Sequence, residues 1–184
     1  MTQHYFIGIS VGGTTPILEL SEHFRTKYQL AERYKVIPHD EDLHITMRYI
    51  GKLEEDHMHL LTSSLQNIAD DHSCFSTSIT GLSFFGSPTG PRVVYLSVEA
   101  VGMMRHMQKK ISKHTESLLE LQKENRFVPH ITIAKKRKTA EKMQIVKEAV
   151  SPLKLEITGF SLFKIHPNER PSYEEIAFFP LKKS

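Results

Sequence analysis

One three-residue word occurs twice in this sequence, and the repeat constrains the fold more than any other feature. His-Ile-Thr begins at His44 and again at His130, 86 positions later in a chain of 184 residues. With only eleven histidines available, chance would produce far fewer than one such word. A spacing close to half the chain indicates an internal duplication, with two related halves packed around a shared site.

Each copy of the word is expected to begin a β-strand. Side chains alternate along a strand, so His44 and Thr46 project from one face while the aliphatic residues between and after them turn into the core. The second copy repeats this arrangement with His130 and Thr132. If an approximate two-fold axis relates the halves, two imidazoles and two hydroxyls face one point, which is a constellation of the size of a phosphate group.

Such a site suits cleavage of a strained or cyclic phosphodiester. An imidazole with a pKa near 6.5 can activate water or protonate a departing oxygen near neutral pH, and neither role requires a metal ion. Threonine hydroxyls can donate to the nonbridging oxygens, and a cation can stabilise the developing charge. Lys135 is a candidate cation, but it lies three residues after Thr132. Strand alternation therefore predicts the opposite face for it, unless the strand twists or ends there.

The rest of the chain is predicted to interleave strands and helices. Strands are expected at residues 4–11, 43–50, 75–85, 92–99, 129–135, 153–164 and 173–179. Helices are expected at residues 16–31, 54–68, 101–122 and 139–150. The Gly- and Pro-rich segment 86–91 is interpreted as a long hairpin loop. Hairpins and alternating strands favour antiparallel sheets, so the predicted fold class is α+β.

Composition narrows the setting in which the chain works. Hydrophobic residues at 39% and charged residues at 24% are typical of a soluble globular protein. A single cysteine, Cys74, can form neither an internal disulfide nor a multi-thiolate metal site, and this favours a reducing compartment. The sequence contains no signal-peptide pattern and no apolar run near the roughly 20 residues that span a bilayer. We therefore expect a cytoplasmic protein that does not enter the membrane.

The net charge of +3 is distributed unevenly along the chain. Residues 123–147 carry a net charge of +6, whereas the remainder carries −3. A local positive field fits a short anionic substrate better than a long duplex, which usually requires an extended basic face. On charge alone, a solvated lysine-rich segment without a binding role explains the pattern equally well.

The residues around both words resemble the 2H phosphoesterase superfamily, whose signature is a pair of His-x-Thr-x motifs. The most similar branch is its bacterial RNA 2′,3′-cyclic phosphodiesterases, also called the 2′-5′ RNA ligase family. The segments that carry the resemblance are 5–9, 44–51, 85–96 and 126–135. The family usually has arginine at the position of Lys135, so a phosphate contact there would be a point charge instead of a bidentate fork.

The resemblance implies a bilobal fold and a specific reaction. It implies two pseudo-symmetric lobes of antiparallel sheet with flanking helices around a central cleft, formed by residues 1–184 as a single domain. The implied reaction is metal-independent and cofactor-free hydrolysis of an RNA 2′,3′-cyclic phosphate to a 2′-phosphate. His44 would be the general acid toward the 3′ oxygen and His130 the general base for water. Thr46, Thr132 and Lys135 would bind the phosphate. Reverse, ATP-independent 2′-5′ joining of RNA ends is also implied.

Two other functions stay open beside this one. The chain could be a noncatalytic RNA- or nucleotide-binding module, or a 2H phosphodiesterase for another small cyclic phosphate or a 2′-5′ oligonucleotide. The expected partners are RNA ends or small cyclic nucleotides, and the expected state is a monomer. Arg48 and Arg126 flank the motifs as candidate RNA contacts, with packing or ion pairing as the alternative. The symmetric chemistry by itself would allow either histidine to be the acid.

A short motif near the start of the chain resembles that of a different enzyme class, but its context does not fit. Residues 8–12 match the Gly-x-Ser-x-Gly nucleophile elbow of serine hydrolases, with Ser10 as the nucleophile. An elbow requires the serine at the turn itself. Here the apolar alternation places Ser10 inside the strand, and the turn follows at Gly12 and Gly13.

Overall fold

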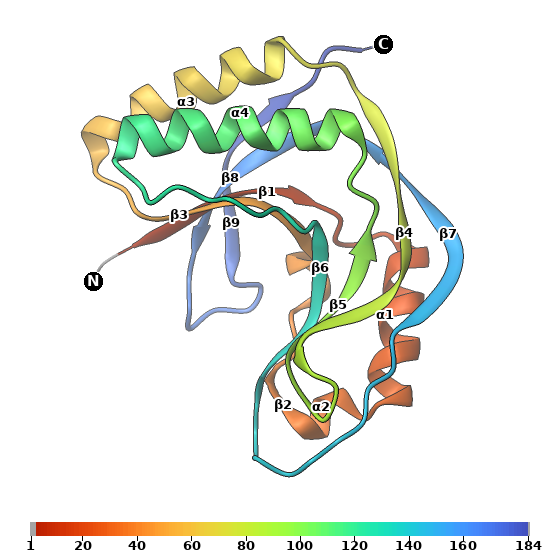
Figure 1. Ribbon diagram of the computed structural model, residues 1–184. Helices are drawn as coiled ribbons and strands as arrows, with labels where there is room; N and C mark the ends of the chain where they lie inside the picture. Colours follow the sequence, from red (N-terminus) through yellow and green to blue (C-terminus); the bar gives the residue numbers. More distant parts are fainter. Residues whose placement is uncertain (1–2, 184) are drawn as a thin grey trace.

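The computed structural model describes residues 3–183 and has the predicted α+β class (Figure 1). The strands are β1 His4–Ser10, β2 Tyr34–Val36, β3 His44–Lys52, β4 Phe75–Ser87, β5 Gly90–Val98, β6 His130–Arg137, β7 Glu148–Ile157, β8 Gly159–Ile165 and β9 Tyr173–Pro180. The helices are α1 Thr15–Lys27, α2 Leu30–Arg33, α3 Glu55–Asp70 and α4 Gly102–Leu119, with a 3-10 turn, η1, at Asp40–Asp42. The short elements β2 and η1 lie in a segment that the sequence pattern left as a connection, whereas α2 begins within the last two residues of the helix predicted at 16–31.

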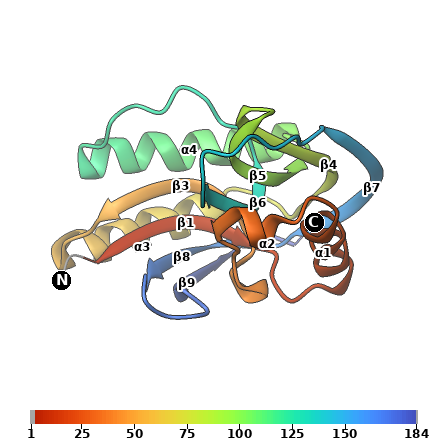
Figure 2. The ribbon, with the colours of Figure 1, turned by 90° about the horizontal axis from the view of Figure 1, so that it is seen from below.

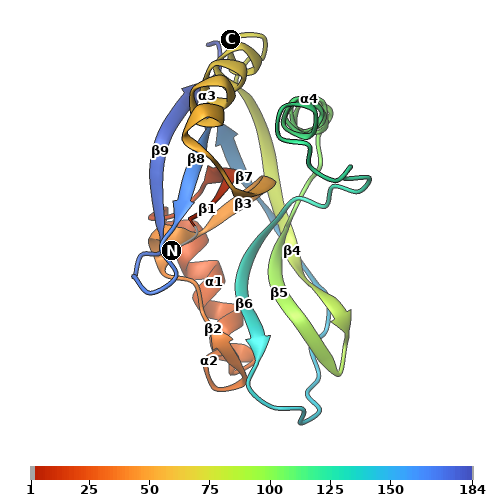
Figure 3. The same cartoon turned by 90° about the vertical axis from the view of Figure 1, so that its left-hand side faces the viewer.

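The strands form one antiparallel sheet that divides into two lobes at its centre. The strand order is β7-β4-β5-β6-β3-β1-β8-β9, with β2 added beside β6. The two motif strands, β3 and β6, are neighbours joined through the single registered pair of Ile45 and Ile131. Because the joint is so narrow, the strands on either side diverge (Figure 3). Lobe one contains β3, β1, β8 and β9, and lobe two contains β6, β5, β4 and β7.

The lobes are not the two halves of the chain, and this corrects the simplest form of the duplication hypothesis. The predicted strand at 153–164 is two strands that belong to different lobes. β7 pairs with β4 in lobe two, and β8 pairs with β1 in lobe one. Only Thr158 separates them. A side chain at Gly159 would place its Cβ 2.7 Å from the carbonyl oxygen of Phe179, so glycine permits the close strand approach just after this crossing.

The helix predicted at residues 139–150 is wrong. Residues 138–147 form an extended connection without a helix, and β7 begins at Glu148 (Figure 2). Met143 and Ile145 are buried two positions apart. Their backbone N–H groups donate to the carbonyls of Thr89 and Pro88 at 3.0 and 3.2 Å. Tertiary hydrogen bonds to the β4–β5 turn have therefore replaced the local helical pairing.

The hairpin loop at 86–91 is shorter than predicted. β4 continues to Ser87 and β5 starts at Gly90, so the turn consists of Pro88 and Thr89. A register shift after Phe85 and a positive φ of 100° at Gly86 let the strands continue through a glycine-rich segment.

Helices α3 and α4 pack against each other along one end of the molecule (Figures 1 and 3). Both helices bury the apolar side chains that recur at helical spacing. These residues are Leu61, Leu65 and Ile68 on α3, and Met104, Met107 and Ile111 on α4. Within residues 3–183, none of the helices is long and apolar enough to cross a bilayer.

Gly12 is predicted to be intolerant of a side chain. A Cβ there would lie 2.7 Å from the carbonyl oxygens of both Asp40 and Glu41, which are backbone atoms of η1. Gly12→Ala must therefore displace η1, and we expect the free energy of unfolding to fall by about 1–3 kcal/mol in urea denaturation. Gly102→Ala is the matched control, because a Cβ at Gly102 meets nothing within 4 Å. The control is expected to change stability by less than about 1 kcal/mol. Equal stability of the two variants would contradict the packing described here.

Candidate active site

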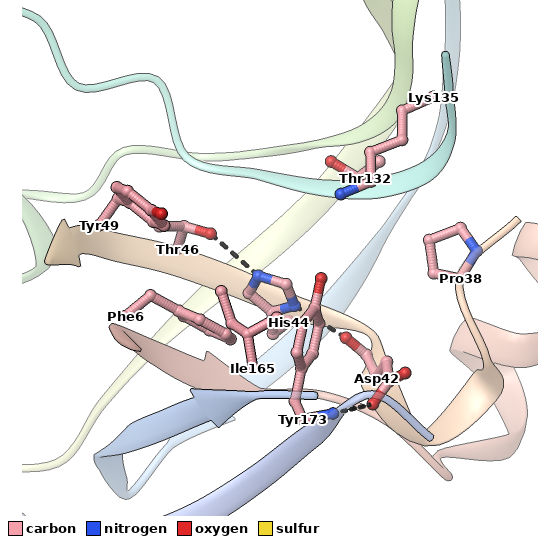
Figure 4. Close-up of a pocket in the computed structure, with 10 residues that line it drawn as sticks. All are labelled: Phe6, Pro38, Asp42, His44, Thr46, Tyr49, Thr132, Lys135, Ile165 and Tyr173. Carbon is pink, nitrogen blue, oxygen red and sulfur yellow. Dashed lines mark hydrogen bonds between the residues drawn. The ribbon is translucent and has the colours of Figure 1, made fainter. Parts of the chain in front are cut away.

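The first histidine and threonine lie where strand alternation places them. His44 and Thr46 are half-buried on the cleft face of β3, and Ile45 and Met47 beneath them are buried in the core. In β6, His130 and Thr132 are likewise half-buried. Thr132 faces Thr46 and His44 across the cleft (Figure 4).

A one-residue bulge follows the threonine in each motif strand. In β3, Arg48 and Thr46 pair with consecutive residues of β1, which leaves Met47 without a partner. In β6, Ala134 and Thr132 pair with consecutive residues of β5, which leaves Ile133 as the extra residue. An extra residue reverses the alternation of the side chains beyond it, because alternation has a period of two residues.

The bulges bring a further side chain of each strand onto the cleft face. Lys135 lines the same cavity as Thr132, although regular alternation would place it on the opposite face. Tyr49, three residues after Thr46, lines that cavity for the same reason. The cation that the sequence pattern could not place is thus at the cleft through a bulge, and not through the end of the strand.

In each bulge, the backbone carbonyl of the extra residue accepts a hydrogen bond from a side chain of a helix. The Gln108 side chain on α4 donates from Nε2 to the Met47 carbonyl at 3.2 Å. The Arg25 guanidinium on α1 donates from Nε to the Ile133 carbonyl at 3.2 Å. Both side chains are buried, so the bulges are held by polar contacts that water does not compete for. Neither residue was identified from sequence, because their role depends on bulges that the sequence does not show.

The two imidazoles are held in the same way. The His44 Nδ1 lies 2.7 Å from the Asp42 carbonyl, and the His130 Nδ1 lies 2.7 Å from the Val128 carbonyl. A carbonyl can only accept, so each Nδ1 carries the proton, and in the neutral ring Nε2 is then the acceptor. The His44 Nε2 accepts from the Thr46 hydroxyl at 2.9 Å. In each case the carbonyl belongs to the residue two positions before the histidine.

Aromatic rings enclose both imidazoles. The rings of Phe6 and Tyr173 lie 4.6 and 5.1 Å from that of His44. Around His130, the rings of Phe85 and Tyr95 both lie at 5.0 Å. These aromatic residues were missed in the sequence, since they come from β1, β4, β5 and β9 and meet the histidines only in the folded sheet.

This enclosure lowers the basicity of the site. Burial disfavours the imidazolium and lowers the pKa of His44 to about 4, an effect that the Asp42 carbonyl partly opposes and the Lys135 cation reinforces. Burial also lowers the pKa of His130, against the effect of its bond to Val128. The pKa of Lys135 is lowered by burial and by its neighbour Lys136. A bound anion would offset the cost of charging all three side chains.

Asp42 connects the site to the far strand of lobe one. Its buried carboxylate accepts hydrogen bonds from the backbone N–H groups of Ser172 and Tyr173 at 2.7 and 3.2 Å. Its own carbonyl holds His44. One residue therefore fixes both the imidazole and the start of β9, which carries the Tyr173 ring.

The predicted site residues line two adjoining cavities. The first, of about 200 Å³, is lined by His44, Thr46, Thr132 and Lys135 among others (Figure 4). The second, of about 260 Å³, is lined by His130 and Arg126, and shares Thr46 with the first. The motif residues are thus together along one cleft, with the two histidines on either side of Thr46.

Two other residues singled out in the sequence lie outside these cavities. The Arg48 guanidinium is buried and pairs with Glu124 and with Glu116, the latter at 3.9 Å, and it also donates to the Gln122 carbonyl. It therefore holds the connection between α4 and β6 and faces away from the cleft. Ser10 is the last residue of β1, four positions before the cap of α1, so it does not occupy a strand-to-helix elbow.

Comparisons with known proteins identify relatives of this chain. A family model described as the 2′-5′ RNA ligase superfamily matches residues 16–169. The RNA 2′,3′-cyclic phosphodiesterase of Bacillus subtilis is 30% identical over 190 residues, which cover 97% of this chain and 96% of that protein. A relative of the same name from Geobacillus stearothermophilus is 28% identical over 183 residues. The match covers 97% of this chain but only 57% of that relative's length.

Solved structures establish the fold independently. A crystal structure from Thermus thermophilus superposes with a TM-score of 0.82 at 20% identity, over 98% of this chain and 99% of the other. LigT from E. coli, crystallised with 3′-AMP, superposes with a TM-score of 0.80 at 18% identity, over 98% and 99% of the two chains.

The lowered pKa of His44 is expected to make stability depend on pH. In the unfolded chain His44 binds a proton near pH 6.5, whereas in the folded chain it binds one only near pH 4. The contribution of neutral His44 to the free energy of unfolding is therefore fully present above pH 6.5 and is lost as the pH falls toward 4. His44→Asn should remove about 2 kcal/mol of this loss between pH 7 and 4.5, since asparagine keeps an N–H donor but does not ionise. Urea denaturation of both proteins at the two pH values measures it. An identical pH dependence in the variant would show that folded His44 is not depressed in pKa.

Proposed function

This chain belongs to the 2′-5′ RNA ligase superfamily, and we propose that it hydrolyses RNA 2′,3′-cyclic phosphates to 2′-phosphomonoesters without a metal ion. The observation that carries the proposal is the matched pair of histidines. Each is anchored at Nδ1 by a backbone carbonyl, so Nε2 is the unprotonated nitrogen of each neutral ring, and the two rings line adjoining cavities of one cleft.

The proposed reaction is an in-line displacement at phosphorus. The Nε2 of His130 takes a proton from water as the water oxygen bonds to phosphorus, and the bond from phosphorus to the 3′ oxygen breaks. The protonated Nε2 of His44 gives its proton to that 3′ oxygen, so the products are a 2′-phosphate and a 3′-hydroxyl. An acid and a base on separate strands that flank one phosphate site fit this arrangement, because attacking and leaving oxygens lie on opposite sides of phosphorus.

The remaining cleft residues bind and stabilise the phosphate. The Thr132 hydroxyl can donate to a nonbridging oxygen, and the Thr46 hydroxyl can do so once the Nε2 of His44 is protonated and no longer accepts from it. Lys135 adds a positive charge where negative charge develops. The bound phosphate also changes the protonation of His44, whose pKa of about 4 leaves it neutral at pH 7 in the free protein. A phosphate beside the ring raises that pKa and favours the protonated, acidic form.

The histidine geometry favours catalysis over binding alone. A module that only held RNA would gain more from cations than from two imidazoles whose burial opposes their charge. Imidazoles that can be neutral or protonated at Nε2 near pH 7, once an anion is bound, are instead what proton transfer requires. A related phosphodiesterase for another small cyclic phosphate or a 2′-5′ oligonucleotide would use the same groups, and a substrate panel separates it from the proposal.

Several further properties stay predictions from the sequence. These are the assignment of acid to His44 and base to His130, a single bilobal domain over residues 1–184, a monomeric state, a cytoplasmic location and reverse 2′-5′ joining. An RNA contact by Arg126 is also proposed, since it lines the cavity beside His130.

The proposal is tested by turnover of a nucleoside 2′,3′-cyclic phosphate in the presence of EDTA. The wild type should form the 2′-phosphate, and His44→Ala and His130→Ala should each lower kcat by roughly 10²–10⁴-fold, the usual contribution of one acid or base. His59→Ala is the matched control, because His59 is an exposed residue of α3 outside the cleft.

The outcomes separate the alternatives. Tight, salt-sensitive RNA binding with no product from any cyclic phosphate would favour the noncatalytic module. Retained wild-type activity in both cleft variants would refute the roles assigned to the histidines.

A further inference from the structure

A third cavity continues the catalytic cleft on the side of Lys135. It measures about 220 Å³ and directly borders the cavity lined by His44, Thr46, Thr132 and Lys135, which we call the catalytic cavity. The residues common to both cavities are Pro38, Asp42, Lys135, Ile165 and Tyr173. The wall that belongs to the third cavity alone includes His39, Lys136 and Arg170. We name this third cavity the basic cavity.

The charges around the basic cavity favour an anion. Lys135, Lys136 and Arg170 contribute three cations, and Asp42 is the one carboxylate among its described lining residues. The Asp42 carboxylate already accepts two backbone N–H groups, so it is occupied within the protein. The Arg170 guanidinium donates one of its N–H groups to the Ile37 carbonyl at 3.3 Å, which positions it at the rim.

The backbone conformation of Lys136 supports a preformed binding site. Lys135 and Lys136 are consecutive in β6 and would normally point to opposite faces of the sheet. Both nevertheless line the basic cavity. Lys136 has a φ of 62°, in the left-handed region that non-glycine residues seldom adopt, and this breaks the alternation. A strained conformation of this kind persists where the surrounding structure holds it, often at a binding site.

We propose that the basic cavity binds a second phosphate of the substrate, the 5′-phosphate of the nucleotide whose cyclic phosphate occupies the catalytic cavity. The inference rests on the proposed function. An RNA that ends in a cyclic phosphate continues only through the 5′ oxygen of its last ribose, so its next phosphate is one ribose away. A cavity that shares a wall with the catalytic cavity is placed to receive it. In an RNA chain this second phosphate is the last internucleotide linkage.

The opposite end of the cleft is less suited to that phosphate. There the cavity beside His130 is lined by Arg126 but also by Glu124 and the rings of Phe85 and Phe127. Glu124 is already paired with Arg48, so the described lining residues of the two ends differ in providing one cation here against three around the basic cavity. The aromatic surface here fits a nucleoside better than a second anion. The asymmetry of the two ends gives the substrate one orientation in the cleft.

The test compares two substrates that differ by one phosphate, adenosine 2′,3′-cyclic phosphate with a 5′-hydroxyl or with a 5′-phosphate. We expect the 5′-phosphate to raise kcat/KM roughly tenfold, the size of a charge-assisted contact. The advantage should shrink with added salt more steeply than activity on the 5′-hydroxyl compound. Lys136→Gln and Arg170→Gln should each lower the ratio of the two kcat/KM values toward one. Lys142→Gln, an exposed lysine that lines neither the basic nor the catalytic cavity, should leave the ratio unchanged.

The possible results separate a failure of the second phosphate site from a failure of the proposed function. If neither substrate turns over, the proposed function fails. If both turn over with equal kcat/KM, the function stands and the second phosphate site is refuted. A preference for the 5′-phosphate that survives in both cavity variants would also refute the site, by locating the contact elsewhere. Because Lys136 is exposed, its variant is expected to fold, and its melting curve checks that a lost preference does not reflect unfolding.

Discussion

A bulge one residue after the motif threonine sets the geometry of the cleft in both lobes. Without it, the side chain three residues beyond each threonine would point to the opposite face of the sheet. With it, Lys135 and Tyr49 join the threonines at the cavity. The bulges are in turn held by Arg25 and Gln108, which come from different helices and satisfy the equivalent carbonyls. The helices thus stabilise the register as well as the core.

The surroundings of the histidines follow the same pseudo-symmetry. Each ring is anchored at Nδ1 by a carbonyl two residues earlier and enclosed by two aromatic rings. Enclosure makes a low-dielectric environment, which lowers the pKa of both imidazoles and strengthens their response to a bound phosphate. The symmetry ends beyond the rings. Lys135 lies near His44, whereas the cavity of His130 contains Arg126 and Glu124, so the two histidines have different electrostatic surroundings.

The sequence predicted the features that depend on side-chain alternation within one strand. It did not predict those that depend on contacts between distant segments. Alternation correctly placed His44, Thr46, His130 and Thr132 on one face, because their aliphatic neighbours must be buried. It could not place Lys135, since a bulge depends on the pairing of the adjacent strand. The segment 139–150 looks helical in isolation but is fixed as an extended chain by bonds to the β4–β5 turn.

Other features were beyond sequence reasoning for a similar reason. The repeat correctly indicated two related lobes, yet the chain crosses between them at Thr158, so neither lobe is a half of the sequence. Asp42 carries no motif of its own. Its importance comes from a carbonyl that meets His44 and a carboxylate that meets the start of β9, 130 positions along the chain.

The proposed chemistry depends on both imidazoles of the free protein being neutral at pH 7, protonated at Nδ1 and unprotonated at Nε2. Nitrogen-15 chemical shifts of the histidine rings measure this directly, with His44→Asn and His130→Asn used to assign the two signals. We expect the Nδ1–H tautomer for both rings at pH 7, with His44 keeping it until the pH approaches about 4. A proton on Nε2 of either neutral ring, or a charged ring at pH 7 without a bound anion, would contradict it.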